Sequence, residues 1–217
     1  MKRIAFLLLC CTQQVLGQST NLVGYVNTLQ GTNSKHELTY GNTYPTTALP
    51  FGMHTWTPQT GKNGDGWKYQ FFKTTIRGFQ QAHQCSSWTT DYDVFSLMPV
   101  SGKLVFGEDD RATGFRHENE IAKPNHYKVK LDNGITTEIA PTERGAHLKF
   151  AFPKKSGSWI ILDGYTGISD LKIDVKNRRI TGYVANNKNN RGILIRSYLN
   201  VQFDKPFKAW GSWEASR

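Results

Sequence analysis

The sequence predicts an all-β fold, a large antiparallel β-sandwich. Most apolar runs after residue 20 alternate apolar and polar side chains, the pattern of strands with one buried face. Gly, Asn and Pro interrupt these runs at short intervals, and no stretch has the 3.6-residue period of an amphipathic helix. With 217 residues and 38% hydrophobic content, the chain can bury one large core.

The expected strands follow one another with short turns between them. The Asp-Asn-Gly at 132–134 predicts a hairpin, because Asn-Gly tolerates the positive φ of a type I′ turn. The polar run at 186–192 predicts a loop. We expect a single domain over residues 21–217. Its strand-like runs are 103–106, 126–131, 135–140, 147–152, 159–165, 171–175, 179–184 and 192–203.

Residues 1–17 have the pattern of an export signal. Lys2 and Arg3 precede an apolar run over 4–11, and Gly17 supplies the small residue of a cleavage site. We therefore expect an exported protein, periplasmic or extracellular. No apolar run approaches the roughly 20 residues that span a bilayer, so no transmembrane segment is expected. Acylation of Cys10 or Cys11 is the alternative that stays open.

The net charge does not point to a nucleic-acid partner. Lys and Arg total 27 against 17 Asp and Glu, a formal net charge of +10. These cations are scattered, with short runs at Lys154-Lys155 and Arg178-Arg179. Neither run alternates with aromatic residues as a single-strand binding platform does. We expect solvated surface charge.

Few residues suit a metal or a nucleophile. Removal of the signal leaves Cys85, which has no Cys-x-x-Cys spacing and no partner for an internal disulfide. Three acidic pairs admit a paired-carboxylate interpretation, although carboxylates on loops are usually solvated. These pairs are Asp91/Asp93, Asp109/Asp110 and Glu118/Glu120. No catalytic residue and no metal ligand is therefore assigned.

Two tryptophans stand in polar loops. Trp67 ends Gly-Lys-Asn-Gly-Asp-Gly-Trp, and Trp88 lies within His-Gln-Cys-Ser-Ser-Trp-Thr-Thr-Asp-Tyr-Asp. Proteins hold sugars with such rings, placing the ring under the apolar face of the pyranose and amides or carboxylates on its hydroxyls. Large rings also fill sandwich cores. Carbohydrate binding and structural packing therefore both stay open from these residues alone.

Three stretches resemble, in order, the N-terminal domain of glycoside hydrolase family 92. They are residues 26–61, beginning VNTLQGTNSKHELTYGNTYP, residues 76–102, IRGFQQAHQCSSWTTDYDVFSLMPVSG, and residues 115–153, beginning FRHENEIAKPNHYKVKLDNG. The family consists of secreted, calcium-dependent α-mannosidases that act from the non-reducing end. The resemblance covers nearly the whole chain after the signal. It implies that the loop containing residues 83–88 closes over a mannose pocket.

The resemblance also implies where the chemistry resides. In the family, the general acid, the general base and the calcium ligands lie mainly on a second, α-helical barrel domain. These enzymes invert the anomeric centre, so acid and base stand about 6.5–9.5 Å apart. The sequence ends before the expected barrel, so we expect a sandwich truncated at its C-terminus, with its last strands missing. The implied partners are α-mannoside glycans and that barrel, and no calcium is expected on this chain alone.

Four residues carry the implied substrate contacts. Trp88 matches the family's aromatic residue near the leaving-sugar subsite, and Gln84, Asp65 and Trp67 lie in matching loops. His83 is expected to brace its loop. Asp91 and Asp93 are not carried over as catalytic, because the family's acid and base do not come from this motif.

Three functions compete. The chain is the carbohydrate-contacting N-terminal domain of an inverting α-mannosidase-like glycoside hydrolase, a stand-alone carbohydrate-binding module, or an inactive gene fragment. The first is favoured, because the loop resembles half of a composite pocket.

Overall fold

The computed structural model describes residues 21–63, 67–82, 95–154, 157–165, 168–188 and 194–214. This part of the chain contains strands and two short 3₁₀ helices, η1 (Leu22–Tyr25) and η2 (His36–Asn42), and no α-helix. None of its helices is long and apolar enough to cross a membrane. The strands are β1 (Thr55–Gln59), β2 (Thr75–Ile76), β3 (Gly78–Ala82), β4 (Phe95–Ser101), β5 (Thr113–Lys123), β6 (His126–Leu131), β7 (Thr136–Thr142), β8 (Gly145–Ala151), β9 (Ser158–Asp163), β10 (Ile168–Asp174), β11 (Arg179–Lys188) and β12 (Leu194–Gln202).

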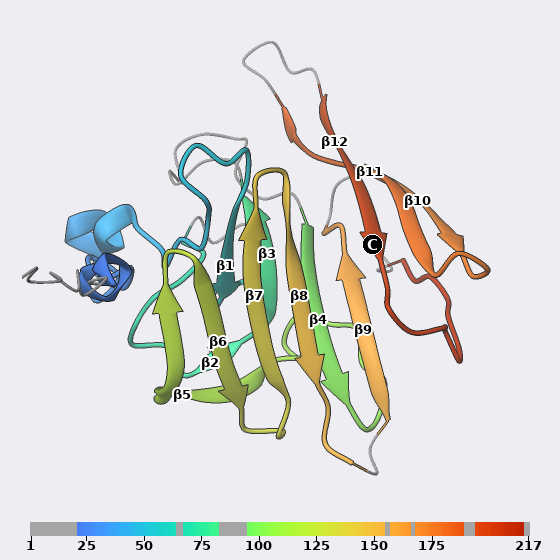
Figure 1. Ribbon diagram of the computed structural model, residues 1–217, viewed down its shortest axis with the longest axis horizontal. Helices are drawn as coiled ribbons and strands as arrows, with labels where there is room; N and C mark the ends of the chain where they lie inside the picture. Colours follow the sequence, from blue (N-terminus) through green and yellow to red (C-terminus); the bar gives the residue numbers. More distant parts are fainter. Residues whose placement is uncertain are drawn as a thin grey trace, which may run out of the picture.

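The strands form three antiparallel sheets. A five-stranded sheet has the order β2-β5-β6-β7-β8, and a four-stranded sheet has the order β1-β3-β4-β9. These two sheets lie face to face, and a third sheet, β10-β11-β12, extends beyond β9 (Figure 1). The predicted all-β antiparallel sandwich is confirmed.

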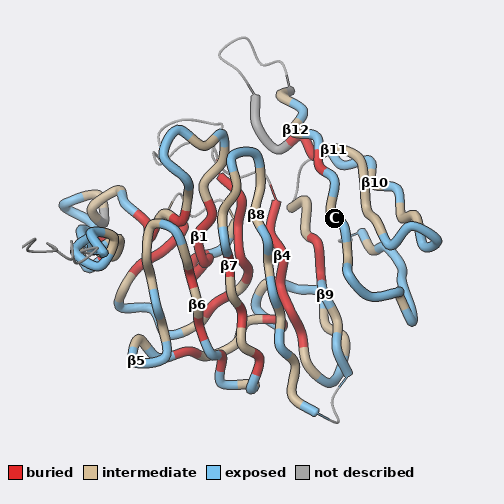
Figure 2. Tube along the Cα trace, viewed as in Figure 1, coloured by how far each residue is buried: buried red, intermediate tan, exposed pale blue. Residues whose placement is uncertain are grey.

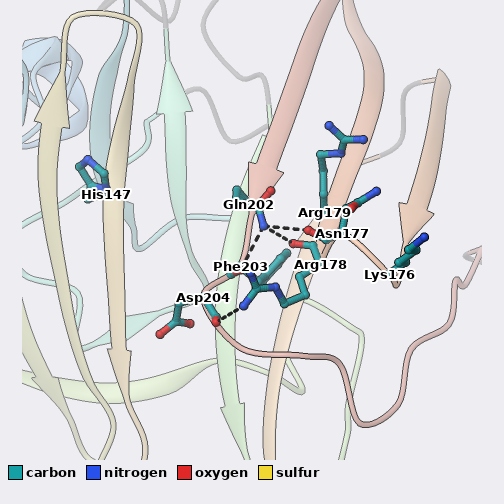
Figure 3. Close-up of a pocket in the computed structure, with 8 residues that line it drawn as sticks. All are labelled: His147, Lys176, Asn177, Arg178, Arg179, Gln202, Phe203 and Asp204. Carbon is teal, nitrogen blue, oxygen red and sulfur yellow. Dashed lines mark hydrogen bonds between the residues drawn. The ribbon is translucent and has the colours of Figure 1, made fainter.

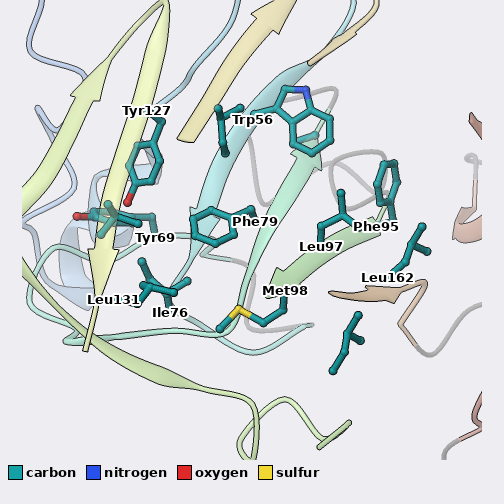
Figure 4. Packing of buried hydrophobic residues seen from close by; sticks show 14 of the residues in the cluster. Trp56, Tyr69, Ile76, Phe79, Phe95, Leu97, Met98, Tyr127, Leu131 and Leu162 are labelled. Atoms are coloured by element: carbon teal, nitrogen blue, oxygen red, sulfur yellow. The ribbon is translucent and has the colours of Figure 1, made fainter. Parts of the chain in front are cut away.

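The core lies between the two larger sheets, and buried residues follow their strands (Figure 2). Phe79 on β3 crosses the layer, with its ring centroid 6.2 Å from Tyr127 on β6 and 6.4 Å from Phe150 on β8. Trp56 and Phe95 make a perpendicular ring contact at 5.9 Å (Figure 4). Large rings thus join strands from both sheets, and their burial is the main stabilising contribution to the fold.

The predicted strand runs are mostly confirmed. Residues 126–131 are β6, and the runs starting at 135, 147, 159, 171, 179 and 192 correspond to β7 to β12 within a few residues. The run at 103–106 is wrong, because this segment forms no strand and instead packs Leu104 and Val105 against the core from a loop. Four alternating residues fit either arrangement, so their pattern alone does not fix a strand.

The hairpin at 132–134 is confirmed, but its predicted turn type is wrong. Asn133 is not among the non-glycine residues with positive φ, whereas Gly134 has φ 86°. The amide of Gly134 donates to the carbonyl of Leu131 at 2.9 Å, and the amide of Leu131 donates to Ile135 at 2.8 Å. This is the three-residue connection, in which a turn is followed by a left-handed glycine, and not the two-residue type I′ turn.

The C-terminal segment returns to the sandwich after β12. Trp213 stacks on Phe106 in the loop after β4, with ring centroids 5.1 Å apart. The same loop accepts a hydrogen bond at the carbonyl of Gly102 from the indole of Trp159, at 3.0 Å. Trp210 lies in the sequence between β12 and Trp213, and it is 63% exposed. Residues 1–17 lie outside the described residues, so the export signal stays a prediction. The missing last strands also stay a prediction.

Candidate functional site

The loop that carries Trp88 leaves the four-stranded sheet between β3 and β4. Its roots are Ala82 and Phe95, both buried. The Thr55 hydroxyl donates to the carbonyl of Ala82 at 3.0 Å and also contacts the Tyr44 hydroxyl at 2.9 Å. Both ends of this loop are therefore fixed by the sandwich core.

Several predicted residues lie outside the described residues. Gln84 and Trp88, with His83, Cys85, Asp91 and Asp93, fall in 83–94, and Asp65 falls in 64–66. Their assignments as substrate contacts stay predictions.

Trp67 is described, and it is half-buried. Its indole N–H donates to the carbonyl of Thr39 at 2.9 Å, and its ring lies edge-on to His36 with centroids 6.1 Å apart. The indole is thus fixed along one edge. This position is compatible with a partly exposed ring beside a ligand, and equally with a ring that packs a loop onto η2.

The segment after Trp67 is tied to the sandwich at successive residues. The Tyr69 hydroxyl donates to both Glu120 oxygens, at 3.2 and 2.9 Å. The amide of Gln70 donates to the Thr60 hydroxyl at 2.9 Å, and the amide of Phe71 donates to the carbonyl of Thr32 at 3.1 Å. Trp67 therefore stands at the start of a well-anchored segment.

A row of polar residues crosses the four-stranded sheet on one face. Thr57, Gln80, Ser96 and Asp163 are register partners on β1, β3, β4 and β9. The first three are almost completely buried. Sequence reasoning missed this row, because its members are distant in sequence and only the strand register aligns them.

A hydrogen-bonded chain links this row to the roots of both predicted loops. Gln80 donates to the Tyr165 hydroxyl at 2.5 Å, which lies 3.4 Å from Gln59 Oε1. Gln59 donates to Glu108 at 2.8 Å, and Glu108 accepts the amide of Asn63 at 3.1 Å.

Both ends of this hydrogen-bonded network adjoin predicted loops. Asn63 precedes the loop with Asp65, and Gln80 lies two residues before the root of the loop with Trp88. Burial raises the pKa of the Tyr165 phenol above its ordinary value, so this hydroxyl stays protonated and able to donate.

The space for this hydrogen-bonded network depends on Gly78. A Cβ at Gly78 would lie 2.9 Å from Ser96 Oγ and 3.0 Å from Gln59 Oε1. A buried ion pair holds the neighbouring loop, since the Arg111 guanidinium lies 2.5 Å from Asp163 and also donates to the carbonyl of Arg77. The polar network is thus enclosed by the sheet and by the loop that carries Glu108 and Arg111.

The described acidic residues differ in their surroundings. Asp109 is a surface carboxylate whose pKa is lowered mainly by its hydrogen bond to Lys62. Glu118 is exposed, whereas the Glu120 side chain is 1% exposed and points into the sandwich. A paired role needs both groups in one site, whereas the side chains of Glu118 and Glu120 have different surroundings.

A separate shallow groove of about 820 Å³ lies between β8 and the end of the third sheet. Its wall includes His147, the turn at 176–179, Gln202 and Asp204 (Figure 3). The turn is held from within, since Gln202 donates to the carbonyls of Asn177 and Arg178 at 2.9 and 3.1 Å. Trp67, the predicted substrate-binding residue within the described part of the chain, does not line this groove.

The sequence from residue 25 to residue 217 matches the glycosyl hydrolase family 92 N-terminal domain. The chain belongs to this family. The structure of a family GH92 inverting mannosidase from Bacteroides thetaiotaomicron is similar, with a TM-score of 0.71 and 40% identity, over 77% of this chain and 22% of that one. A GH92 α-mannosidase from the same organism shares the fold, with a TM-score of 0.69, 24% identity, and 87% and 26% of the two chains covered.

A fungal relative is also similar. An uncharacterized secreted glycosidase from Arthroderma benhamiae is 25% identical over 164 residues, which cover 70% of this chain and 21% of the relative. This family 92 domain therefore spans about a fifth to a quarter of the length of these relatives.

Proposed function

We propose that this family 92 domain contacts the glycan of an inverting α-mannosidase-like glycoside hydrolase and supplies part of its mannose pocket. The observation that carries the proposal is the match to the family 92 N-terminal domain over residues 25–217. The inverting mannosidase that is 40% identical indicates the reaction class. We propose Trp88, Gln84, Asp65 and Trp67 as the substrate contacts.

The network from Gln80 to Asn63 supports a common role for the two loops. Each end of this network adjoins one loop. A rigid, internally bonded support is what a binding constellation needs, because side chains on a poorly held loop lose affinity through ordering costs.

We also propose that the protein is exported, in line with the secreted fungal relative. Calcium belongs to the expected full-length family enzyme. Among the described residues, no group of three or more His, Cys, Asp or Glu is placed to hold a metal ion.

Saturation-transfer NMR with methyl α-mannoside tests the proposal on this domain joined to the helical barrel of a family 92 enzyme, because the proposed pocket is composite. We expect transfer to the mannoside, with methyl α-galactoside as the stereochemical control. Trp88→Ala should weaken binding by about 1–3 kcal/mol, by analogy with other ring-on-aromatic contacts. The melting temperature should stay nearly unchanged if Trp88 contacts the sugar from a polar loop. Removing a core Trp would instead cost about 3–5 kcal/mol of stability.

The matched control is Trp210→Ala, which removes a Trp that is 63% exposed and outside the proposed loops. It should leave mannoside binding unchanged. Absence of transfer to the mannoside would refute the proposal. A large loss of stability in Trp88→Ala with unchanged binding would assign Trp88 to the core.

A second measurement separates glycan contact from catalysis. We expect the purified chain to release no mannose from 4-nitrophenyl α-mannoside, with or without calcium, because the resemblance places both catalytic carboxylates on another domain. Release that a chelator abolishes would contradict this expectation.

A further inference from the structure

The strand β5 contains an irregularity that the proposed function does not use. Phe115 pairs with Leu131 on β6, but the next pair is Glu120 with Val129, so four residues of β5 stand opposite Lys130 alone. These four residues are Arg116, His117, Glu118 and Asn119, and Glu120 follows them directly. Bulges of this kind redirect side chains locally, and here His117 and Glu120 come together.

Glu120 is a buried carboxylate with three polar neighbours. The hydroxyls of Tyr69 and Tyr127 donate to it, Tyr127 at 2.7 Å, and His117 Nδ1 lies 2.8 Å from Oε2. The two tyrosines stand side by side at one edge of the core (Figure 4). Burial, and next the Glu120 charge, raise the pKa of both phenols far above the ordinary value, so both remain donors.

The other ring nitrogen of His117 also faces an acceptor. Nε2 lies 2.7 Å from the carbonyl oxygen of Phe71, and the two rings stack with centroids 3.9 Å apart and planes 1° from parallel. A carbonyl and a carboxylate both only accept, whereas neutral imidazole has a single N–H. Both contacts are therefore made as hydrogen bonds when the imidazole carries two protons and a positive charge.

We propose that His117 is a positioning residue, a protonated clasp that holds the Trp67–Phe71 segment against β5. Its charge compensates Glu120, whose side chain is 1% exposed, and no other cation forms an ion pair with Glu120 among the described residues. The groups that face His117 are Glu120, the Tyr69 hydroxyl at 3.5 Å, the carbonyl and ring of Phe71, and the edge of Phe115 at 5.2 Å.

Deprotonation has a definite consequence for Trp67. A neutral His117 keeps one of its two hydrogen bonds and turns a lone pair toward the other acceptor, which weakens the hold on Phe71 or on Glu120. The His117 side chain is 31% exposed, so its proton can exchange with water. Imidazoles change charge between about pH 5 and 8. The Trp67 segment should therefore be held more firmly at mildly acidic than at mildly alkaline pH.

The relevance of this His117 clasp to glycan binding rests on the proposed function, but the clasp can be tested without sugar. In ¹⁵N-labelled protein, the His117 ring nitrogens should both carry protons at pH 5.5. Between pH 5.5 and 8.5, the indole N–H of Trp67, assigned with Trp67→Phe, should shift with the same midpoint as His117. Its exchange with solvent, corrected for intrinsic pH dependence, should rise about fivefold, the factor for one lost hydrogen bond.

Two variants decide the cause. In a His36→Gln background, which removes the imidazole that lies edge-on to Trp67, His117→Gln should abolish the pH dependence of the Trp67 signal, because an amide keeps one charge state over this range. His147→Gln, which changes an exposed histidine on β8, should leave it intact. A neutral His117 tautomer at pH 5.5, a pH-independent Trp67 signal, or a pH dependence that survives His117→Gln in the His36→Gln background would each overturn the proposal. Failure of mannoside binding would leave these readouts unaffected.

Discussion

At the residue scale, the Glu120 site shows how a buried charge is tolerated. The carboxylate accepts from Tyr69, Tyr127 and His117, which satisfies most of its acceptor capacity within the sandwich. Burying an unpaired carboxylate is costly, and hydrogen bonds to an ionised group are stronger than those between neutral groups. The cluster should therefore contribute to stability through each of its donors.

We expect Tyr127→Phe to lower the free energy of unfolding by about 1.5–3 kcal/mol, since it removes a hydrogen bond to a charged group. The lost bond spans 2.7 Å. Urea denaturation measures the change. The matched control is Tyr198→Phe, which removes a hydroxyl from a residue that is 74% exposed and should change stability by less than about 0.5 kcal/mol. Equal losses in both variants would contradict this account of Glu120.

At the element scale, the third sheet depends on a single glycine. Gly182 on β11 has φ 147°, and a Cβ there would lie 1.9 Å from the carbonyl oxygen of Asp170 on β10. Backbone cannot yield as a flexible side chain can, so Gly182→Ala should separate β10 from β11. We expect a loss of about 3 kcal/mol or more, from the clash and the unfavourable φ together.

Hydrogen exchange locates this effect. Amides of β10 and β11 should exchange faster in Gly182→Ala, while those of β6 and β7 should keep their protection. Gly211→Ala is the control, because a Cβ at Gly211 would meet nothing within 4 Å. Unchanged protection of β10 in Gly182→Ala would show that the pairing does not need a glycine there.

Two of the strands that the sequence did not predict, β3 and β4, share a physical reason. β3 is buried at all five residues and β4 at six of seven, so neither shows the alternation of a strand with one wet face. In β5, the charged residues of the bulge interrupt the alternation of apolar and polar side chains that would predict a strand. The alternating runs of β6 and β7 were predicted because each has one buried and one more exposed face.

At the scale of the whole molecule, the candidate site was predictable in part. Polar loops around Trp67 and Trp88 can be read from the sequence, and Trp67 does lie half-buried at a loop root. The network that joins Gln80 through Tyr165, Gln59 and Glu108 to Asn63 could not be predicted, since its members span about half of the chain. Their contact depends on strand register and on one covering loop, which local patterns do not encode.

Buried phenols distributed over the molecule predict how it responds to alkali. Burial raises the pKa of Tyr69, Tyr127 and Tyr165 above the unfolded value, near 10. A raised folded pKa stabilises the protein fully below the unfolded value, and this contribution is lost as the pH rises above about 10. Each such group then costs about 1.4 kcal/mol per pH unit, so three cost about 4 kcal/mol per unit.

We therefore expect cooperative unfolding not far above pH 10, with at least three of the 9 tyrosines ionising only as the near-ultraviolet circular dichroism is lost. Absorbance at 295 nm, followed beside that signal, measures both events. Tyr127→Phe removes one of the three groups, so the alkaline loss of stability should become shallower by about a third. Smooth ionisation of all tyrosines while the circular dichroism persists would mean that these phenols are open to solvent, and the Glu120 cluster would then lack its buried donors.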